Sequence, residues 1–130
     1  MQDRVVAQQS PSPLPSMAGP ADEHLRWFVT SVRDEVVVAL QGEMDMANAD
    51  GLGRALAAVL ETRPSKVTVD LESLSFLDSS GIRCLVIASQ QASAVRSKFV
   101  VRRPGRAVLR VLQLTGTDTM LLEGSDGHAA

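Results

Sequence analysis

The sequence contains few of the side chains on which catalysis and metal binding usually depend. Only one of its 130 residues is cysteine, Cys84, which excludes an intrachain disulfide and fits a reducing cytoplasm. Its two histidines, His24 and His128, lie toward the ends of the chain, where neither is placed to serve a central serine as a base or to complete a zinc site. No glycine-rich loop ending in Lys-Ser/Thr is present to hold a nucleotide. We therefore expect a protein that is not an enzyme and has no metal or other cofactor.

Long hydrophobic segments are also lacking. No apolar run approaches the ~20 residues that span a bilayer. The N-terminus has no apolar core of ~7 to 15 residues, which a secretory signal requires. We expect a cytoplasmic protein with no membrane partner.

Acidic residues are absent from one stretch, residues 96–110, which is rich in arginine and lysine. Such a stretch can contact an acidic protein, a membrane surface or nucleic acid. Phe99 is its only aromatic residue and is expected to pack inward, so bases would find no stacking platform. A net charge of −2 neither requires nor excludes nucleic acid. We interpret the stretch as a solvated basic face and expect no direct nucleic-acid partner.

Composition divides the chain into three parts. Residues 8–20 hold four prolines among serines and small residues, too few large apolar groups to offset the entropy of ordering. We predict a flexible N-terminal extension over residues 1–23, one domain over residues 24–122 and a flexible C-terminal tail over residues 123–130. A domain of about 100 residues is long enough for one hydrophobic core.

The apolar periodicity alternates between the two-residue repeat of strands and the 3.6-residue repeat of helices. An opening hairpin followed by alternating helix and strand patterns predicts an α/β domain with a mixed, mostly parallel sheet of four to five strands flanked by helices. The run Val36 to Leu40 is continuously apolar, which favours a central strand covered on both faces. The expected strands are 25–30, 35–40, 66–71, 98–101 and 119–122, and the expected helices are 52–60, 82–94 and 104–114.

The central feature is Asp78-Ser79-Ser80-Gly81, between the third strand and the second helix. Short side-chain oxygens at a helix N-terminus accept from backbone N–H groups that have no intrahelical partner. A phosphate on a serine there would meet the same donors, so phosphorylation would be compatible with the fold while adding negative charge beside Asp78. Gly81 permits a tight turn or the close approach of another surface. The alternative is that Ser79 and Ser80 are only helix caps.

Helical phase separates the buried and exposed sides of the second helix. With Ile82 and Leu85 turned inward, Arg83 and Ile87 point to solvent, and Ile87 is an exposed apolar group near Ser79. Cys84 falls off the apolar stripe, which predicts partial accessibility. Single exposed apolar residues are common on protein surfaces. The alternative is therefore that Ile87 is such a residue and not part of a partner-binding surface.

Two motifs resemble the STAS domain of bacterial anti-sigma factor antagonists. Gly42-Glu43-Met44-Asp45 is similar to the Gly-Glu-Leu-Asp-like turn that ends a strand in that family. Phe76 to Gly81 is similar to its apolar pair followed by Asp-Ser-Ser-Gly at the start of a helix. The resemblance covers residues 27–122 and implies a STAS-like fold. Many relatives end in a further helix, whereas residues 123–130 are glycine-rich and polar, so a partner surface on that helix is not carried over.

The resemblance implies a partner-switching cycle. The unphosphorylated domain would bind an anti-sigma factor of the ATP-dependent serine kinase type and release a sigma factor, and a serine phosphatase would reset the phosphorylated form. The phosphorylation site falls on Ser79, the first serine of the tetrad. The partner-binding residues would be Asp45, Asp78, Ser79, Ser80, Gly81, Arg83 and Ile87.

Three alternatives remain beside the switch. One is a non-catalytic STAS scaffold subunit of a signalling or transporter complex, and another is a small-ligand sensor that acts through the same face. The third is an enzyme, which would need a base that the sequence does not offer. Asp45, Asp70 and Asp78 could gather at one end of the sheet as a carboxylate cluster, but we interpret such aspartates as caps or turn residues.

Overall fold

The computed structural model describes residues 24–124, and the predicted extension and most of the predicted tail lie outside the described residues. The strands are β1 (Leu25–Val32), β2 (Glu35–Met44), β3 (Lys66–Leu77) and β4 (Lys98–Arg102). The helices are α1 (Ala49–Glu61), α2 (Ser79–Ala94), α3 (Arg106–Leu114) and α4 (Asp118–Leu121). None of the described helices is long and apolar enough to cross a membrane.

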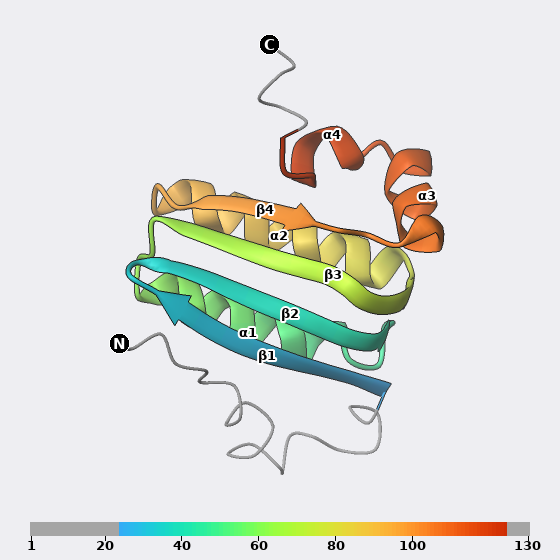
Figure 1. Ribbon diagram of the computed structural model, residues 1–130, viewed down its shortest axis with the longest axis horizontal. Coiled ribbons are helices and arrows are strands. Elements are labelled where there is room, and N and C mark those ends of the chain that lie inside the picture. Colours follow the sequence, from blue (N-terminus) through green and yellow to red (C-terminus); the bar gives the residue numbers. More distant parts are fainter. Residues whose placement is uncertain (1–23, 125–130) are drawn as a thin grey trace.

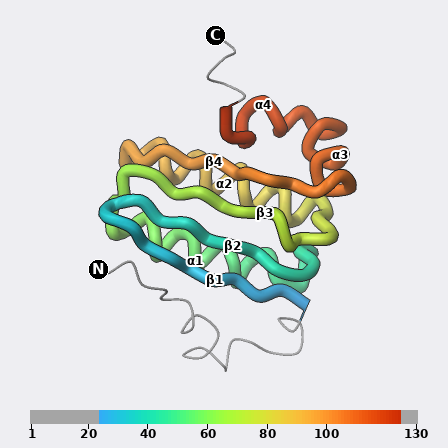
Figure 2. The backbone as a smooth tube through the Cα atoms, viewed as in Figure 1, coloured from blue at the N-terminus to red at the C-terminus, as the bar shows by residue number. Residues whose placement is uncertain are grey.

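The four strands form one sheet in the order β1-β2-β3-β4. β1 runs antiparallel to β2, whereas β2, β3 and β4 are parallel. Helices α1 and α2 lie side by side against one face, and α3 and α4 lie beside the β4 edge (Figure 1). The tube view gives the same two layers (Figure 2). The predicted α/β class with a mixed, mostly parallel sheet is confirmed.

The core forms where the helices cover the sheet. The register aligns Val38 of β2 with Val69 of β3 and Val69 with Val101 of β4, and all three side chains are buried. The apolar stripe of α1 packs on this face through Leu52 and Leu56. The buried hydrophobic positions of β2, α1 and α2 are Val36, Val38, Leu40, Met44, Ala49, Leu52, Leu56, Leu60, Ile82, Cys84, Leu85, Ala88 and Ala92.

Burial along β2 alternates, unlike the expected pattern. Val36, Val38 and Leu40 are buried, but Val37 and Ala39 are only half-buried. The strand is internal, as expected, but the prediction that both of its faces are covered was wrong. The continuous apolar run reflects β-branched preference for strands rather than a second covering layer.

Several predicted boundaries and one predicted element also differ. β2 continues through Met44 and β3 through Leu77, so the expected turn and polar loop are parts of strands with register shifts, one between Gly42 and Glu43. The expected strand 119–122 is instead the short helix α4, followed by an isolated bridge between Leu122 and Val101. The helical turn of α4 is favoured because it buries the Leu121 side chain in the core. In this turn the Leu121 N–H donates a hydrogen bond to the Thr117 carbonyl.

Candidate functional site

Asp78 is the side chain that caps α2. Its Oδ1 accepts hydrogen bonds from the backbone N–H groups of Ser80 (2.9 Å) and Gly81 (3.1 Å). Ser79 is the first residue of the helix and is exposed, and within residues 24–124 its hydroxyl has no hydrogen-bond partner. Capping therefore explains Asp78 but not Ser79, whose hydroxyl faces solvent at a helix N-terminus.

Hydrogen bonds order the β2–α1 loop, which lies at the same end of the sheet as the start of α2. Asp45 Oδ1 accepts from the Ala47 N–H (2.9 Å). Buried Asn48 accepts from the Asp45 N–H through Oδ1 (3.0 Å) and donates from Nδ2 to the Glu43 carbonyl (3.0 Å). Asn48 satisfies backbone groups that the loop leaves unpaired, which fixes the position of Asp45.

Strand pairing brings the two sequence motifs together. Met44 and Leu77 are register partners, so Asp45 and Asp78 follow adjacent residues at the same end of the sheet. The Asp78 N–H donates to the Met44 carbonyl (3.2 Å) across this junction. Asp45 and the helix start at Ser79 therefore share one end of the sheet, although Asp45 and Asp78 are 33 positions apart in the chain.

Gly81 lets α2 pack directly on the ends of these strands. A Cβ at this position would overlap the Leu77 side chain and approach Met44 Cε and Cγ to 3.1 Å. Both neighbours are buried and have little room to move. The close approach predicted for Gly81 is thus a packing requirement, and it holds Ser79 near the β2–α1 loop.

Exposed apolar side chains lie on α2 and at the end of the sheet where α2 begins. Ile87 is 42% exposed, and Ser79, Arg83 and Ile87 recur every four residues on the outer side of α2. The exposure predicted for Arg83 and Ile87 is confirmed. Met46 (74% exposed) and Phe76 (47%) lie at the same end of the sheet and were missed from the sequence. Together, Asp45, Met46, Phe76, Ser79, Arg83 and Ile87 are called the Ser79 surface below.

Two signals could have identified the missed residues. Continuing the two-residue repeat of β3 through Leu77 places Phe76 on the opposite face from buried Leu77. Met46 follows Asp45 in a loop, outside any helical or strand repeat that would predict burial, so its exposure could have been expected.

A shallow groove of about 340 Å³ runs between α1 and α2 beside this surface. Small residues from both helices line it, together with Cys84, Ile87 and the charged residues Asp50 and Arg54. Cys84 is buried, so the predicted partial accessibility was wrong. Burial and, secondarily, the Asp50 charge raise the pKa of Cys84 to about 11, so it is a protonated thiol at neutral pH.

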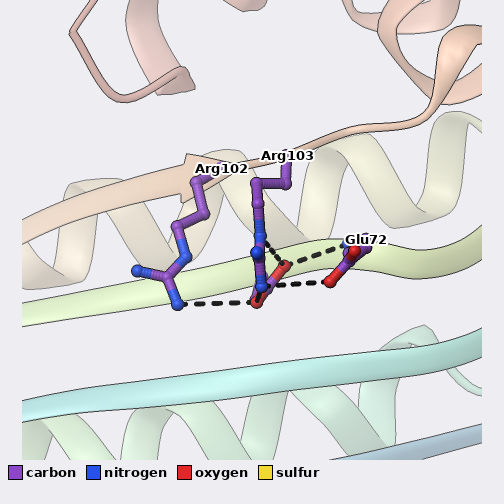
Figure 3. A network of polar contacts seen from close by, with 4 residues as sticks. Glu72, Arg102 and Arg103 are labelled. Atoms are coloured by element: carbon purple, nitrogen blue, oxygen red, sulfur yellow. Dashed lines mark hydrogen bonds and ion pairs between the residues drawn. The ribbon is translucent and has the colours of Figure 1, made fainter.

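Asp70 does not join Asp45 and Asp78. It lies in the middle of β3 and is bound by Arg103 (Nη2 to Oδ2, 2.6 Å) and by Arg102 (3.5 Å) at the end of β4. Figure 3 shows both arginines reaching toward β3, where Glu72 also pairs with Arg103 (3.1 Å). These two arginines of the basic stretch are ion-paired, which corrects the prediction of a wholly solvated face. Within residues 24–124 no three acidic, histidine or cysteine side chains gather as a metal site.

The Asp70 ion pairs predict a pH-dependent stability. Burial raises the pKa of Asp70, but hydrogen bonds from Arg103 and from the Glu72 N–H, with the charges of Arg103 and Arg102, outweigh it and hold the pKa below its ordinary value. The contribution is therefore complete above the unfolded pKa of about 4 and is lost as pH falls through the lower folded value. We expect Asp70→Asn to lower the free energy of unfolding by about 1–3 kcal/mol at pH 7.

Urea unfolding of wild type and Asp70→Asn at several pH values measures this effect. The difference between the two proteins should shrink as pH falls below about 4. Exposed Glu72→Gln is the control and should change stability by less than about 0.5 kcal/mol. A pH-independent Asp70→Asn difference would show that the charge of Asp70 is not what stabilises the fold.

The cap at Asp78 predicts that Asp78→Ala and Ser79→Ala differ in stability. Asp78→Ala removes the acceptor of two N–H groups and should lower the free energy of unfolding by about 1 kcal/mol. Ser79→Ala should leave it unchanged, because the Ser79 hydroxyl has no partner within residues 24–124. Thermal unfolding of the two variants measures this difference, and an equal loss in Ser79→Ala would assign the cap to the serine.

The fold and the junction of the two motifs define a single STAS-type domain. The family model described as "Mlab, STAS domain" matches residues 27–123, and the chain belongs to this family. It is 26% identical over 98 residues to the anti-sigma F factor antagonist of Lysinibacillus sphaericus, an alignment that covers 75% of this chain and 84% of that protein.

Solved structures agree on the fold. An anti-sigma factor antagonist from Mycobacterium paratuberculosis superposes with a TM-score of 0.70 and 29% identity, covering 79% of this chain and 86% of that one. SpoIIAA, a Bacillus cell fate determinant, has been solved unphosphorylated (TM-score 0.67, 22% identity, 79% and 91% coverage) and phosphorylated (0.60, 21%, 79% and 95%).

Proposed function

We propose that this protein is an anti-sigma factor antagonist that is switched off by phosphorylation of Ser79. In its unphosphorylated form it binds an anti-sigma factor of the serine kinase type in the cytoplasm and thereby frees a sigma factor. The kinase transfers a phosphoryl group from its own ATP to the Ser79 hydroxyl, and a metal-dependent serine phosphatase removes it. The ATP and the metal belong to these partners.

The observation that carries this proposal is the position of Ser79. Its hydroxyl is exposed at the N-terminus of α2, and Asp78 supplies the cap, so modification would break no hydrogen bond within residues 24–124. The positive end of the helix dipole stabilises a phosphate at such a position. The domain would therefore stay folded while its surface changes.

The Ser79 surface explains how the modification would control binding. Met46, Phe76 and Ile87 offer apolar area that a partner would cover, with Asp45 and Arg83 beside them. A phosphoserine adds about −1.5 to −2 charges at neutral pH. Covering that charge without a matched cation is unfavourable, so the phosphorylated surface binds less well. Asp78, Ser80 and Gly81 hold the helix start in place.

Relatives support the same role. The similar proteins from Lysinibacillus and Mycobacterium are anti-sigma factor antagonists. A structural relative, SpoIIAA, exists in both phosphorylated and unphosphorylated forms. The scaffold and ligand-sensor alternatives have no such specific support.

A phosphorylation assay tests this proposal directly. The full chain is incubated with lysate of its host and ATP, recovered, and analysed by intact-protein and peptide mass spectrometry. We expect one phosphate on wild type and on Ser80→Ala, and none on Ser79→Ala. Ser80 is the matched control because it neighbours Ser79 in the same helical turn. Phosphate on Ser79→Ala, or no phosphate on any form, would contradict the assignment.

A further inference from the structure

The two edges of the sheet differ in how they are covered. At the β4 edge, Leu122 forms a bridge with Val101, and the Glu123 N–H donates to the Val101 carbonyl (2.8 Å). At the other edge, β1 pairs with β2 alone among the described strands. Within residues 24–124, the fold therefore covers one edge and leaves the other open to a further strand.

β1 has the features of a strand suited to such pairing. It is eight residues long, rich in aromatic and β-branched residues, and Arg26 is its only charged residue. Its register with β2 runs without interruption from Leu25 to Val32, so no bulge twists the edge away. Natural sheets usually blunt an open edge with proline, lysine, bulges or short strands. Apart from the charge of Arg26 near its start, β1 has none of these devices.

Two exposed apolar residues lie on the same strand. Phe28 (37% exposed) and Val32 (44%) lie on the face of β1 that points away from α1, because Trp27 lies near Gly51 of that helix and side chains alternate along the strand. A strand added at this edge would cover part of both side chains. Backbone pairing and apolar burial thus favour the same contact.

We propose that β1 pairs antiparallel with β1 of a second copy of this chain, with Val29 opposite Val29 of the partner subunit. The two four-stranded sheets then become one continuous sheet. This register keeps the helices of both copies on one face, since residues of the same phase oppose one another. It places Phe28 opposite the partner's Thr30 and Arg26 opposite the partner's Val32. No like charges face each other across the new pair.

The N-terminal residues are a poorer occupant of this edge. Residues 8–20 contain four prolines, which lack the N–H that a strand ladder requires. A two-fold antiparallel pair uses a strand already formed in each copy and is the usual symmetry of homodimers. The inference does not depend on phosphorylation or on an anti-sigma factor, because β1 contributes no residue to the Ser79 surface.

Disulfide trapping in the full chain tests the register. Oxidised Val29→Cys should form a covalent dimer efficiently, because this position faces its own copy across the pair. Thr30→Cys is the matched control and should crosslink at least about tenfold less, since it faces Phe28 of the partner subunit and disulfides need Cβ atoms about 4 Å apart. Both variants retain buried Cys84, so any crosslinking through Cys84 is the same in the two proteins. Equal crosslinking of the two variants would overturn the proposed register.

Sedimentation equilibrium tests the dimer without any new cysteine. Wild type should show a concentration-dependent dimer, and Phe28→Glu should weaken it at least about tenfold, because two like charges then lie diagonally across the pair. Circular dichroism establishes that Phe28→Glu is folded. A wild type that is monomeric at every concentration, or a Phe28→Glu dimer as strong as wild type, would overturn the proposal.

Discussion

Replacing Ser79 with glutamate is expected to reduce binding to the anti-sigma factor about a hundredfold, a difference of roughly 3 kcal/mol. The carboxylate would add a charge to the Ser79 surface, whose exposed apolar side chains the partner must cover. The measurement is a pull-down from host lysate with wild-type and Ser79→Glu baits, followed by quantitative mass spectrometry. Wild type should retain a kinase-type anti-sigma factor, and Ser79→Glu should lose it.

Ser93→Glu is the matched control for this experiment. Ser93 is also an exposed serine of α2, but it lies near the other end of the helix. The same added charge should leave retention unchanged there. If Ser79→Glu and Ser93→Glu retain the anti-sigma factor as well as wild type does, charge at Ser79 does not control binding. A scaffold role would then explain the chain better.

Gly42→Ala is expected to give the largest loss of stability, about 3 kcal/mol or more. Gly42 has a φ of +111°, which L residues rarely adopt, and a Cβ there would overlap the backbone carbonyl of His24. The His24 carbonyl, directly before β1, is a backbone group and cannot move aside as a flexible side chain can. The melting temperature should fall by at least about 10 °C, measured by circular dichroism.

Gly116→Ala is the control that measures the cost of backbone strain alone, without the steric overlap expected in Gly42→Ala. Gly116 also has a positive φ (+75°), but no atom lies within 4 Å of a Cβ built there. We expect a cost of only about 1 kcal/mol. A Gly42→Ala protein that is no less stable than Gly116→Ala would contradict the close approach of β1 to Gly42.

Local patterns predicted the elements whose sequence repeats are regular. The alternation of Val67, Val69 and Leu71 predicted β3, and the 3.6-residue repeat of Leu52 and Leu56 predicted α1. The position of Asp-Ser-Ser-Gly at the start of α2 also followed from local preferences, because short polar side chains favour helix N-termini. Each of these signals lies within a few residues.

Features set by distant contacts were not predictable in the same way. α4 looks like a strand locally, but burial of Leu121 favours a helical turn. The pairing of Met44 with Leu77, which brings Asp45 toward Asp78, depends on two strands far apart in the sequence. The burial of Cys84 likewise depends on α1, which closes over the side of α2 that helical phase alone left open.

The Ser79 surface combines both kinds of information. Arg83 and Ile87 follow from helical phase, whereas Met46 and Phe76 become part of the surface only when the β2–α1 loop and the end of β3 meet α2. The resemblance to anti-sigma factor antagonists supplied the role proposed for Ser79. The physical reason that this residue can be modified is that its hydroxyl is exposed and has no hydrogen-bond partner within residues 24–124.

The most direct test compares one protein with and without the phosphate itself. Isothermal titration calorimetry measures the affinity of the full chain for the purified anti-sigma factor before phosphorylation, after phosphorylation of Ser79, and after phosphatase treatment. We predict tight binding, a loss of about a hundredfold or more, and full recovery. Equal affinity of the unphosphorylated and phosphorylated forms would contradict the central claim that a phosphate on Ser79 releases the partner.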